Sequence, residues 1–286
     1  MGKKNIIAFS GINGANADLA CRQAFPYMET KACPSFYEAM QAVERHEADL
    51  CMIPIENSHV GRVAEIHNLL PKTNLFIVGE YFQSVENHLL APKGTQFEDI
   101  KTIYSHPHAL LQCKKKLHDL EKGLKRHFQL VDYANTATAA KDVAQWQDKS
   151  KAAIASELAA ELYGLDIVKR NIEDAKDNTT IFMVMSAEPA DPDAKKSRVI
   201  TSLLFTARNI PAALYKALGG FATNHVNMLK IESYIPSGKS QMAQFFISFE
   251  GTPQQENVKL ALEELGFFCK KVKVLGVYPA DPKRFE

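Results

Sequence analysis

The chain has 286 residues, of which 46% are hydrophobic and 23% are charged, and these values exclude a disordered or a fibrous protein. Its length is enough for roughly two domains with sizeable cores. Lys and Arg total 34 against 33 Asp and Glu, a formal net charge of +1, so the chain lacks a broad basic field for nucleic acid or an acidic membrane. Any anionic ligand must therefore be held by local groups.

The apolar run at residues 6–9 is too short for a signal peptide, and no window reaches the apolar length of a membrane helix. We therefore expect a cytoplasmic protein that contacts no membrane. The five cysteines are widely spaced and include no C-x-x-C pair, which favours buried free thiols over a disulfide framework. His106 and His108 have no cluster of Asp, Glu or Cys beside them, so no metal site is expected.

Strands and helices alternate over about the first 80 residues, which predicts an α/β domain with a parallel core. The strands are expected at 5–10, 49–54 and 75–82, and the helices at 15–25, 35–47 and 61–70. The glycine turn at residues 11–14 could direct backbone N–H groups at an anion, but its spacing matches neither a P-loop nor the dinucleotide fingerprint. An ordinary strand-to-helix turn is the alternative.

Polar side chains follow the strand expected at 49–54. Pro54 removes a backbone donor and restricts the residue before it, so we expect the strand to stop there. Glu56, Asn57 and Ser58 would then lie at its carboxyl end, where ligands bind in open α/β sheets.

A second series of alternating strands and helices follows the first. Its strands are expected at 88–91, 100–104, 128–131 and 152–155, and its helices at 109–120 and up to residues 147 and 163. Ser105 and His106 lie at one strand-to-helix turn, and Asn135 or Thr136 could cap the helix at another. Each such cluster alone is most often a cap, but their shared position at strand ends predicts a small-ligand site between two lobes.

Residues 177–182 carry amide and hydroxyl side chains into an apolar strand at 181–185. Asn178, Thr179 and Thr180 could be held rigidly toward a cleft, because binding groups concentrate on loops that a scaffold fixes. The alternative is a turn in which these side chains bond to their own backbone.

The stretch 188–197 is rich in proline and charge and is expected to be a linker. Beyond it we expect strands at 198–207, 226–234, 240–250 and 269–275, and helices at 212–223 and 254–265. The order βαββαβ is the ferredoxin-like plan. An appended module of this type is usually a binding or oligomerising unit.

Three motifs, taken in order, resemble those of prephenate dehydratase, and the resemblance covers nearly the whole chain. They are residues 53–58 (IPIENS) with Gly61, residues 105–107 (SHP) followed by 109–110 and 112–113, and residues 178–182 (NTTIF). The C-terminal module resembles the ACT domain of this family, most clearly at residues 230–233 (KIES).

The resemblance implies an α/β fold with two domains. Residues 1–187 would form a catalytic domain with two lobes, similar to the periplasmic binding proteins, and 198–286 would form a ferredoxin-like ACT domain. Lobe 1 would comprise about 1–84 plus 166–187, and lobe 2 about 85–165.

The implied activity is that of a carbon–oxygen lyase of phenylalanine biosynthesis, which converts prephenate to phenylpyruvate with loss of water and CO2 and needs no cofactor. Thr180 aligns with the catalytic threonine of the family, and we expect it to donate a hydrogen bond to the departing hydroxyl group. Glu56 is expected to orient neighbouring donors, with a structural role as the alternative, because an ionised carboxylate would repel the two carboxylates of the substrate unless it is turned away. The expected substrate-binding residues are Glu56, Asn57, Ser58, Ser105, His106, Thr136, Asn178, Thr179 and Phe182.

The chain departs from the family pattern at two places in this domain. Ile181 stands where the motif has Arg, which removes a cation suited to a carboxylate. Three interpretations are open: the Arg is mainly structural, another basic residue such as Arg62 does its work, or catalysis is impaired. Ala15 stands where the glycine turn of the family has Thr, although Asn16 could substitute.

The ACT resemblance implies a homodimer or homotetramer that phenylalanine inhibits. The effector motifs fall on Ala213, Leu214, Glu232 and Ser233, without the glycine and the arginine of the family. Glu232 could still bind the ammonium group of a phenylalanine effector, whereas the missing arginine removes a partner for its carboxylate.

Two other functions remain alternatives. Arogenate has an amino group where prephenate has a keto group, and the sequence does not separate an arogenate dehydratase from a prephenate dehydratase. A catalytically silent sensor of a small anion, with an ACT domain, would also be compatible with Ile181.

Overall fold

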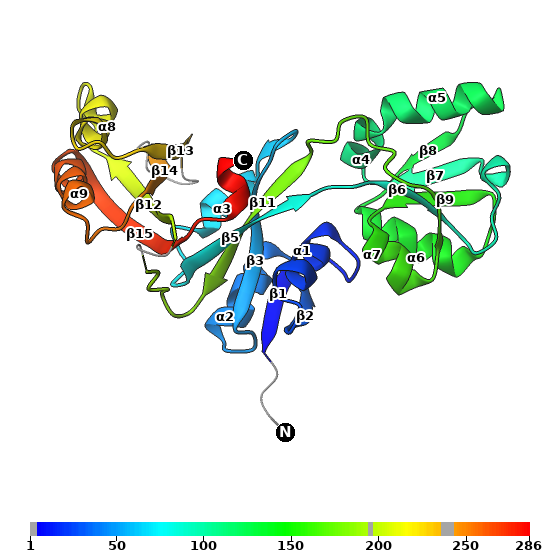
Figure 1. The fold of residues 1–286 in the computed structure, drawn as a ribbon, viewed down its shortest axis with the longest axis horizontal. Coiled ribbons are helices and arrows are strands. Elements are labelled where there is room, and N and C mark those ends of the chain that lie inside the picture. Colours follow the sequence, from blue (N-terminus) through cyan, green and yellow to red (C-terminus); the bar gives the residue numbers. More distant parts are fainter. Residues whose placement is uncertain (1–4, 194–196, 236–242) are drawn as a thin grey trace. The chain divides into compact units, whose positions relative to one another are not determined.

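The structure, a computed structural model, describes residues 5–193, 197–235 and 243–286. The chain has a mixed α/β fold, whose elements are labelled in Figure 1. It forms two compact units. The first unit comprises the described residues up to Ser35, Asn57–Gly61 and Gln83–Thr180, and the second comprises Phe36–Glu56, Arg62–Phe82 and the described residues of Ile181–Glu286.

The N-terminal part of the first unit is a parallel strand pair with one helix. Strand β1 (Ile6–Ser10) pairs with β2 (Glu29–Cys33), and helix α1 (Asn16–Ala24) connects them. Parallel pairing needs such a crossover. The strand and helix predicted before residue 25 are thus confirmed to within one residue.

Most of the first unit is a five-stranded sheet. Its strands are β6 (His88–Ala91), β7 (Thr102–Ser105), β8 (Gln129–Asp132), β9 (Lys151–Ala155) and β10 (Asp166–Lys169). The sheet order is β10-β6-β9-β7-β8, in which β7 is parallel to β8 and β9, and β6 is antiparallel to β9 and β10. A short 3-10 turn, Phe97–Asp99, precedes β7.

Helices cover both faces of this sheet, as Figure 1 shows. They are α4 (Pro107–Gln112), α5 (Lys114–Leu124), α6 (Thr136–Trp146) and α7 (Glu157–Tyr163). Successive strand side chains point to opposite faces. Leu89 and Ile154 therefore pack with α4 and α5, whereas Leu90 and Ala153 pack with α6 and α7.

The second unit contains a second sheet and a C-terminal module. In the sheet, β3 (Leu50–Asn57), β11 (Thr179–Ser186) and β5 (Phe76–Ser84) are neighbours in that order. A short strand, β4 (Gly61–Arg62), pairs with β3. Helices α2 (Phe36–Glu44) and α3 (Ala64–Leu69) complete this part.

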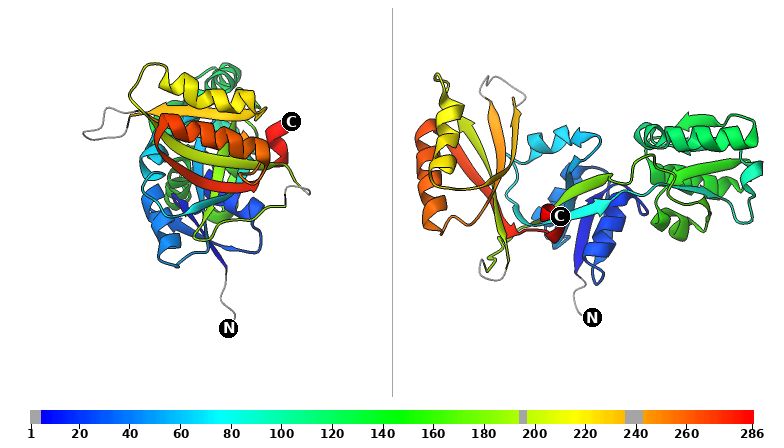
Figure 2. Two further views of the ribbon diagram at one scale, coloured as in Figure 1. Left: turned by 90° about the vertical axis from the view of Figure 1, so that its left-hand side faces the viewer. Right: turned by 45° about the horizontal axis from the view of Figure 1, so that its top comes forward.

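The C-terminal module confirms the predicted βαββαβ order. Its elements are β12 (Val199–Ala207), α8 (Ala213–Thr223), β13 (Met228–Tyr234), β14 (Gln244–Glu250), α9 (Glu256–Phe268) and β15 (Cys269–Pro279). The sheet order is β13-β14-β12-β15, with antiparallel pairs throughout. Both helices lie on one face of this sheet (Figure 2), and a 3-10 turn, Pro282–Phe285, follows β15. Parts of the expected linker and of the loop before β14, residues 194–196 and 236–242, lie outside the described residues.

Two predictions around Pro54 are wrong. Strand β3 does not stop at Pro54 but runs to Asn57, because Ile55 accepts a hydrogen bond from the Val63 N–H (2.9 Å) and stays paired. The expected helix does not start at Gly61, whose φ of +85° is left-handed and which belongs to β4. Helix α3 begins three residues later.

The single helix predicted at 109–120 is two helices, which is a further correction. Helix α4 ends at Gln112, and α5 starts afresh at Lys114. The Asp174 carboxylate accepts hydrogen bonds from the N–H groups of Lys115 (2.9 Å) and Lys116 (2.8 Å). A distant acidic residue thus caps α5, which no local pattern could reveal.

The five cysteines are free and buried, as predicted. None of the described helices has the length and apolar character of a membrane span.

Candidate active site

Three polar side chains from the predicted motifs meet in the first unit. The Asn57 side-chain amide donates to Thr180 Oγ1 (3.0 Å) and to Asn178 Oδ1 (2.7 Å). Asn178 in turn donates through Nδ2 to Gln112 Oε1 (3.0 Å). We call Asn57, Thr180, Asn178 and Gln112 the amide ladder. It joins residues from all three of the motifs that carry the family resemblance.

The orientation of the Asn57 amide follows from its backbone neighbours. Asn57 Oδ1 accepts hydrogen bonds from the N–H groups of His59 (3.0 Å) and Val60 (3.0 Å). A backbone N–H can only donate, so the oxygen must face these two groups and the NH2 must face Thr180 and Asn178. The direction of the Asn57–Thr180 bond is therefore fixed by geometry.

This direction has a chemical consequence for Thr180. Its oxygen already accepts a hydrogen bond from Asn57, so its own O–H proton remains to be donated elsewhere. Thr180 lies at the start of β11 and is only half-buried, so an incoming group could reach it. The site can thus present an oriented hydroxyl donor to a ligand.

Ser58 and Thr179 hold the backbone on either side of the ladder. Ser58 N–H donates to the Thr179 carbonyl (2.9 Å), and Thr179 N–H donates to Ser58 Oγ (2.9 Å). Ser58 Oγ also donates to the Asp177 carbonyl (3.0 Å), and Asp177 pairs with His59 (3.1 Å). The Ser58 hydroxyl is therefore used in joining two chain segments.

A pocket of about 290 Å³ adjoins the amide ladder in the first unit. Asn178 and Gln112 line it together with His59, His108 and Lys115. The Lys115 side chain is a cation in this lining, which also includes the carboxylates of Glu173 and Asp174.

Two predicted ligands, His106 and Thr136, start helices near other strand ends. His106 caps α4, and its Nδ1 accepts the His108 N–H (3.2 Å). Partial burial, and then the neighbouring His108, lower the pKa of His106. Thr136 is the first residue of α6, whose cap is Asn135 through the Thr138 N–H (2.7 Å). The structure does not bring either residue into the amide ladder.

Ser105 and Phe182 are corrections to the predicted binding set. Ser105 has no exposed surface, and its hydroxyl donates to the Ile154 carbonyl (2.7 Å), so it stabilises the pairing of β7 with β9. Phe182 is 2% exposed and belongs to the core of the second unit. Strand alternation turns its ring inward, and neither side chain can meet a substrate.

The glycine turn is not an anion site. Gly14 N–H donates to the Asp18 carboxylate (2.8 Å), and the Ala15 N–H donates to the Ile12 carbonyl (3.1 Å). Asp18, which is fully buried, thus occupies the start of α1 with its own negative charge. The ordinary turn, the alternative weighed from the sequence, is what the structure shows.

Residues 7–190 match a sequence profile of the prephenate dehydratase family. The chain belongs to the prephenate dehydratase family. Members of this family are lyase-type dehydratases, and the predicted resemblance is confirmed for the catalytic part of the chain.

Two relatives match along almost all of this dehydratase. A bifunctional N-acyl-homoserine lactone acylase/prephenate dehydratase of Komagataeibacter europaeus is 46% identical over 284 residues, which cover 99% of each chain. An arogenate dehydratase/prephenate dehydratase of Arabidopsis thaliana is 38% identical over 290 residues, which cover 98% of this chain and 74% of that longer protein.

Two solved structures show the same mixed α/β fold. GqqA, described as a quorum-quenching acylase, matches with a TM-score of 0.89 at 45% identity, over 98% of this chain and 100% of that chain. A prephenate dehydratase from Arthrobacter aurescens in complex with L-Phe matches with a TM-score of 0.85 at 28% identity, over 98% and 91% of the two chains.

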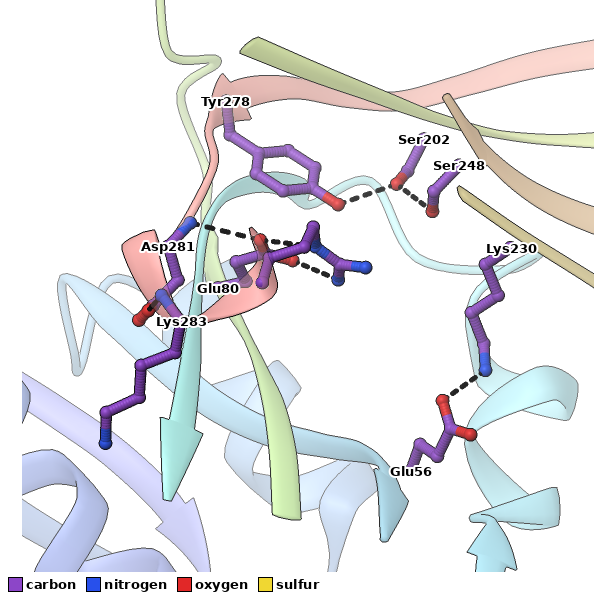
Figure 3. Close-up of polar contacts among 9 residues, drawn as sticks. Glu56, Glu80, Ser202, Lys230, Ser248, Tyr278, Asp281 and Lys283 are labelled. Carbon is purple, nitrogen blue, oxygen red and sulfur yellow. Dashed lines mark hydrogen bonds and ion pairs between the residues drawn. The ribbon is translucent and has the colours of Figure 1, made fainter. Parts of the chain in front are cut away.

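In the second unit of this dehydratase, the partly exposed Glu56 forms an ion pair with Lys230 of β13 (Figure 3). Arg62, the residue suggested as a substitute cation, instead donates to the Ser233 carbonyl (2.8 Å) and lies 3.6 Å from Glu232. Ile181 lines a pocket of about 310 Å³ together with Glu56 and Lys230. The cation beside Glu56 therefore comes from the C-terminal module.

The predicted effector residues of the dehydratase take different places in this module. Ala213 is buried, and Leu214 packs against the module core. Glu232 Oε1 lies 3.2 Å from Lys230 Nζ, so it already has cationic partners in its own unit. Ala212 stands where the effector motif of the family has glycine. Its φ of +58° is the left-handed conformation that glycine adopts most easily.

Sequence reasoning missed Gln112, Lys230 and Arg284 as members of these polar networks. Gln112 and Lys230 lie inside stretches that carried the family resemblance, which is a signal that could have singled them out. Arg284 follows the last strand and pairs with Glu80, which is 2% exposed, and no local pattern marks that contact.

Proposed function

We propose that the protein is a prephenate dehydratase in which Thr180 donates a hydrogen bond to the departing hydroxyl group of prephenate. The observation that supports this role is the fixed direction of the Asn57–Thr180 hydrogen bond, which leaves the Thr180 proton available. Asn57 and Asn178 would orient Thr180, and Ser58 and Thr179 would hold the backbone that carries them.

In the reaction, the bond from the ring to its carboxylate breaks and releases CO2. The electron pair enters the ring, which becomes aromatic as the ring C–O bond breaks. The departing hydroxyl leaves as water after gaining a proton, and phenylpyruvate remains. Because aromatisation drives the reaction, the enzyme needs chiefly to hold a dianion and stabilise the leaving oxygen.

Substitution of Thr180 tests this proposal. Thr180→Val keeps the shape of the side chain and removes the donor, and we expect kcat to fall by about a hundredfold or more, as for loss of one oriented donor. Thr180→Ser keeps the donor and should retain most of the activity. Phenylpyruvate release at near-normal rate from the valine variant, with an unchanged melting temperature, would refute the role of Thr180.

The substrate choice between prephenate and arogenate needs its own assay. Relatives at 33 to 38% identity include proteins named arogenate dehydratases. Release of phenylpyruvate from prephenate at a higher kcat/KM than release of phenylalanine from arogenate would support our proposal. The reverse order would make the protein an arogenate dehydratase, and no product from either would favour a silent sensor of a small anion.

A second candidate activity is hydrolysis of N-acyl-homoserine lactones. It is favoured by the 46% identity, over 99% of both chains, to the bifunctional acylase/prephenate dehydratase. Incubating the purified protein with an N-acyl-homoserine lactone and measuring free fatty acid and homoserine lactone would test it. If the same preparation of Thr180→Val keeps this hydrolysis while losing dehydration, the two activities use different groups.

We assign the domains as a catalytic domain up to residue 187 and an ACT domain from residue 198, joined by a linker. The βαββαβ order of the module supports the second assignment. Strand β10 is counted with the lobe around 85–165, because it pairs with β6. Phenylalanine as effector, supported by the L-Phe complex of the Arthrobacter aurescens relative, and a homodimer or homotetramer complete the proposal. Phenylalanine titrated into the steady-state assay and mass measured in solution test these last two parts.

A further inference from the structure

Four charged side chains of the second unit form a network of ion pairs between β3, β4 and the C-terminal module: Glu56, Lys230, Glu232 and Arg62. Lys230 Nζ forms an ion pair with Glu56 Oε2 and lies 3.2 Å from Glu232 Oε1, and Arg62 lies 3.6 Å from Glu232 Oε2. Two carboxylates and two cations therefore alternate in space, and their charges sum to zero. Arg62 is also anchored through the Ser233 carbonyl.

The central ion pair is partly buried, more deeply at Lys230 than at Glu56. The Lys230 side chain is 15% exposed and that of Glu56 is 33% exposed. Apolar side chains, including Ile181, Met183 and Phe246, line the same 310 Å³ pocket together with the charged side chains of Glu56, Glu80, Lys230, Glu232 and Arg284. In such surroundings an ion pair is screened less than at the surface, so the position of Lys230 matters for Glu56.

Glu56 is the immediate neighbour of Asn57, which donates to Thr180. The two residues are the last of strand β3, and their side chains leave opposite faces of the strand. A shift of the Glu56 backbone would therefore also move Asn57, whose side-chain amide orients Thr180. Figure 3 shows Lys230 reaching down from the module to Glu56.

We infer that Lys230 is a positioning residue for the dehydratase reaction, supplied to the catalytic strand by the C-terminal module. Its ammonium group neutralises Glu56, which would otherwise repel a substrate with two carboxylates, and holds the Glu56–Asn57 segment in the geometry that leaves the Thr180 proton free. Without Lys230, the carboxylates of Glu56 and Glu232 would face one another with no cation between them, and repulsion would move Glu56. This inference rests on the proposed function.

The test is steady-state kinetics of the full-length Lys230→Met variant with whichever of prephenate and arogenate the wild type converts. We expect kcat/KM to fall by about tenfold or more, with a rise in KM from the uncompensated Glu56 charge and a fall in kcat from the displaced Asn57. Lys230→Arg should recover most of the activity. The double variant Glu56→Gln with Lys230→Met should have a KM within about threefold of Glu56→Gln alone, because position 56 then carries no charge and Arg62 still pairs with Glu232.

Lys273 offers a matched control. It lies on β15 of the same module, and its ammonium group donates to the carbonyls of Leu70 (3.2 Å), Pro71 (3.4 Å) and Thr73. Lys273→Met therefore loosens a comparable contact of the module without touching Glu56, and its KM should stay at the wild-type value.

Three results would overturn the inference while the wild type is active: normal kinetics of Lys230→Met, an equal rise in KM for Lys273→Met, or no recovery of KM in the double variant. The last two would reduce Lys230 to a general contact of the module. A wild type that converts neither substrate would overturn the proposed function, and the inference would fall with it.

Discussion

Asn57 donates its side-chain amide to the hydroxyl oxygen of Thr180 across 3.0 Å. The two residues are 123 positions apart in the chain, and each lies at one end of a strand, the last residue of β3 and the second of β11. Because Asn57 can only donate at this position, reversing its hydrogen-bonding character should change the function of Thr180 without removing Thr180.

Asn57→Asp is the variant that makes this change. Its second carboxylate oxygen would accept the Thr180 proton and would also face Asn178 Oδ1, an acceptor. We expect kcat to fall by about a hundredfold, similar to the loss of an oriented donor in a preorganised site. Dehydratase kinetics measure the effect, and circular dichroism melts show whether the fold is intact.

Ser58→Ala provides the comparison for Asn57→Asp. It removes two hydrogen bonds of the same loop, to the Asp177 carbonyl and from the Thr179 N–H, but leaves the amide ladder complete. Its kcat should change by less than about tenfold. If Ser58→Ala and Asn57→Asp reduce kcat equally, loop order rather than the orientation of Thr180 sets the rate.

Breaking the Glu80–Arg284 ion pair should destabilise the second unit strongly. The Glu80 side chain is 2% exposed, and it accepts hydrogen bonds from Arg284 Nε (2.7 Å) and the Asp281 N–H (3.1 Å), as Figure 3 shows for Asp281. Arg284→Met leaves a buried carboxylate without its cation, which should lower the free energy of unfolding by about 3 to 5 kcal/mol. Urea denaturation measures this loss.

The double variant Glu80→Met with Arg284→Met separates charge from packing. With both charges removed, most of the stability should return, because an apolar pair of similar volume often replaces a buried ion pair at little cost. The Asp281 N–H would still lose its acceptor, at a cost of about 1 kcal/mol. A double variant no more stable than Arg284→Met would show that shape, not the unpaired charge, causes the loss.

The elements that the sequence predicts well are those with local signals. Asn135, one of the two cap candidates expected from the sequence, accepts a hydrogen bond from an N–H group three residues on, and the helix that it starts is confirmed. The prediction that the strand stops at Pro54 is wrong because β3 stays paired through Ile55. The residues of one strand do not reveal its partner strand.

In the candidate site, too, the sequence predicts which residues matter but not the contacts between residues that are far apart in the chain. The motifs marked Asn57, Asn178 and Thr180, but not that one amide would donate to the other two side chains. Glu56 and Lys230 are 174 positions apart, and their contact depends on how the module packs within the second unit. Ser105 and Phe182 were placed wrongly because polarity or motif membership does not say which face of a strand a side chain takes.

Gly276 should be irreplaceable at the close approach of β15 to β5. A Cβ added there would lie 2.0 Å from the carbonyl oxygen of Ile77 and 2.8 Å from its carbonyl carbon. These are backbone atoms, so relief requires the strands to move apart, and we expect Gly276→Ala to cost at least about 1 to 3 kcal/mol. Thermal unfolding monitored by circular dichroism would measure the cost.

Gly266 in α9 is the control for Gly276, because a Cβ there meets nothing within 4 Å. Gly266→Ala should stabilise the protein by up to about 1 kcal/mol through helix propensity. Equal melting temperatures of the two variants would contradict the steric role assigned to Gly276.

His67 should make the stability of the second unit depend on pH. His67 is 2% exposed, its ring lies 5.3 Å from that of Tyr234 and 6.1 Å from that of Phe246, and neither ring nitrogen has a hydrogen-bond partner among the residues that the structure describes. Burial lowers the pKa of His67 below its ordinary value of 6.5, Glu232 opposes this shift, and Arg62 and Lys230 add to it.

The sign follows from proton binding. With a lower pKa in the folded state, the unfolded state binds more protons as the pH falls below 6.5, so this stability is present above that pH and is lost in acid. His67→Phe keeps an aromatic ring between Tyr234 and Phe246 and removes both the titration and the unpaired nitrogens. We expect it to raise the free energy of unfolding at pH 7 by about 1 kcal/mol or more, since unpaired buried polar groups are costly.

Urea denaturation of wild type and His67→Phe at pH 7, 6 and 5 tests this prediction. The stability difference between them should widen as the pH falls, because only the wild type loses the contribution of His67. Burial also lowers the pKa of His88 and His106, but both proteins contain these residues, so their effect cancels in the difference. His118→Gln, at a residue whose side chain is 58% exposed, should follow the wild-type curve. A constant difference across this pH range would show that folding does not change proton binding by His67, which contradicts a lowered pKa in the folded state.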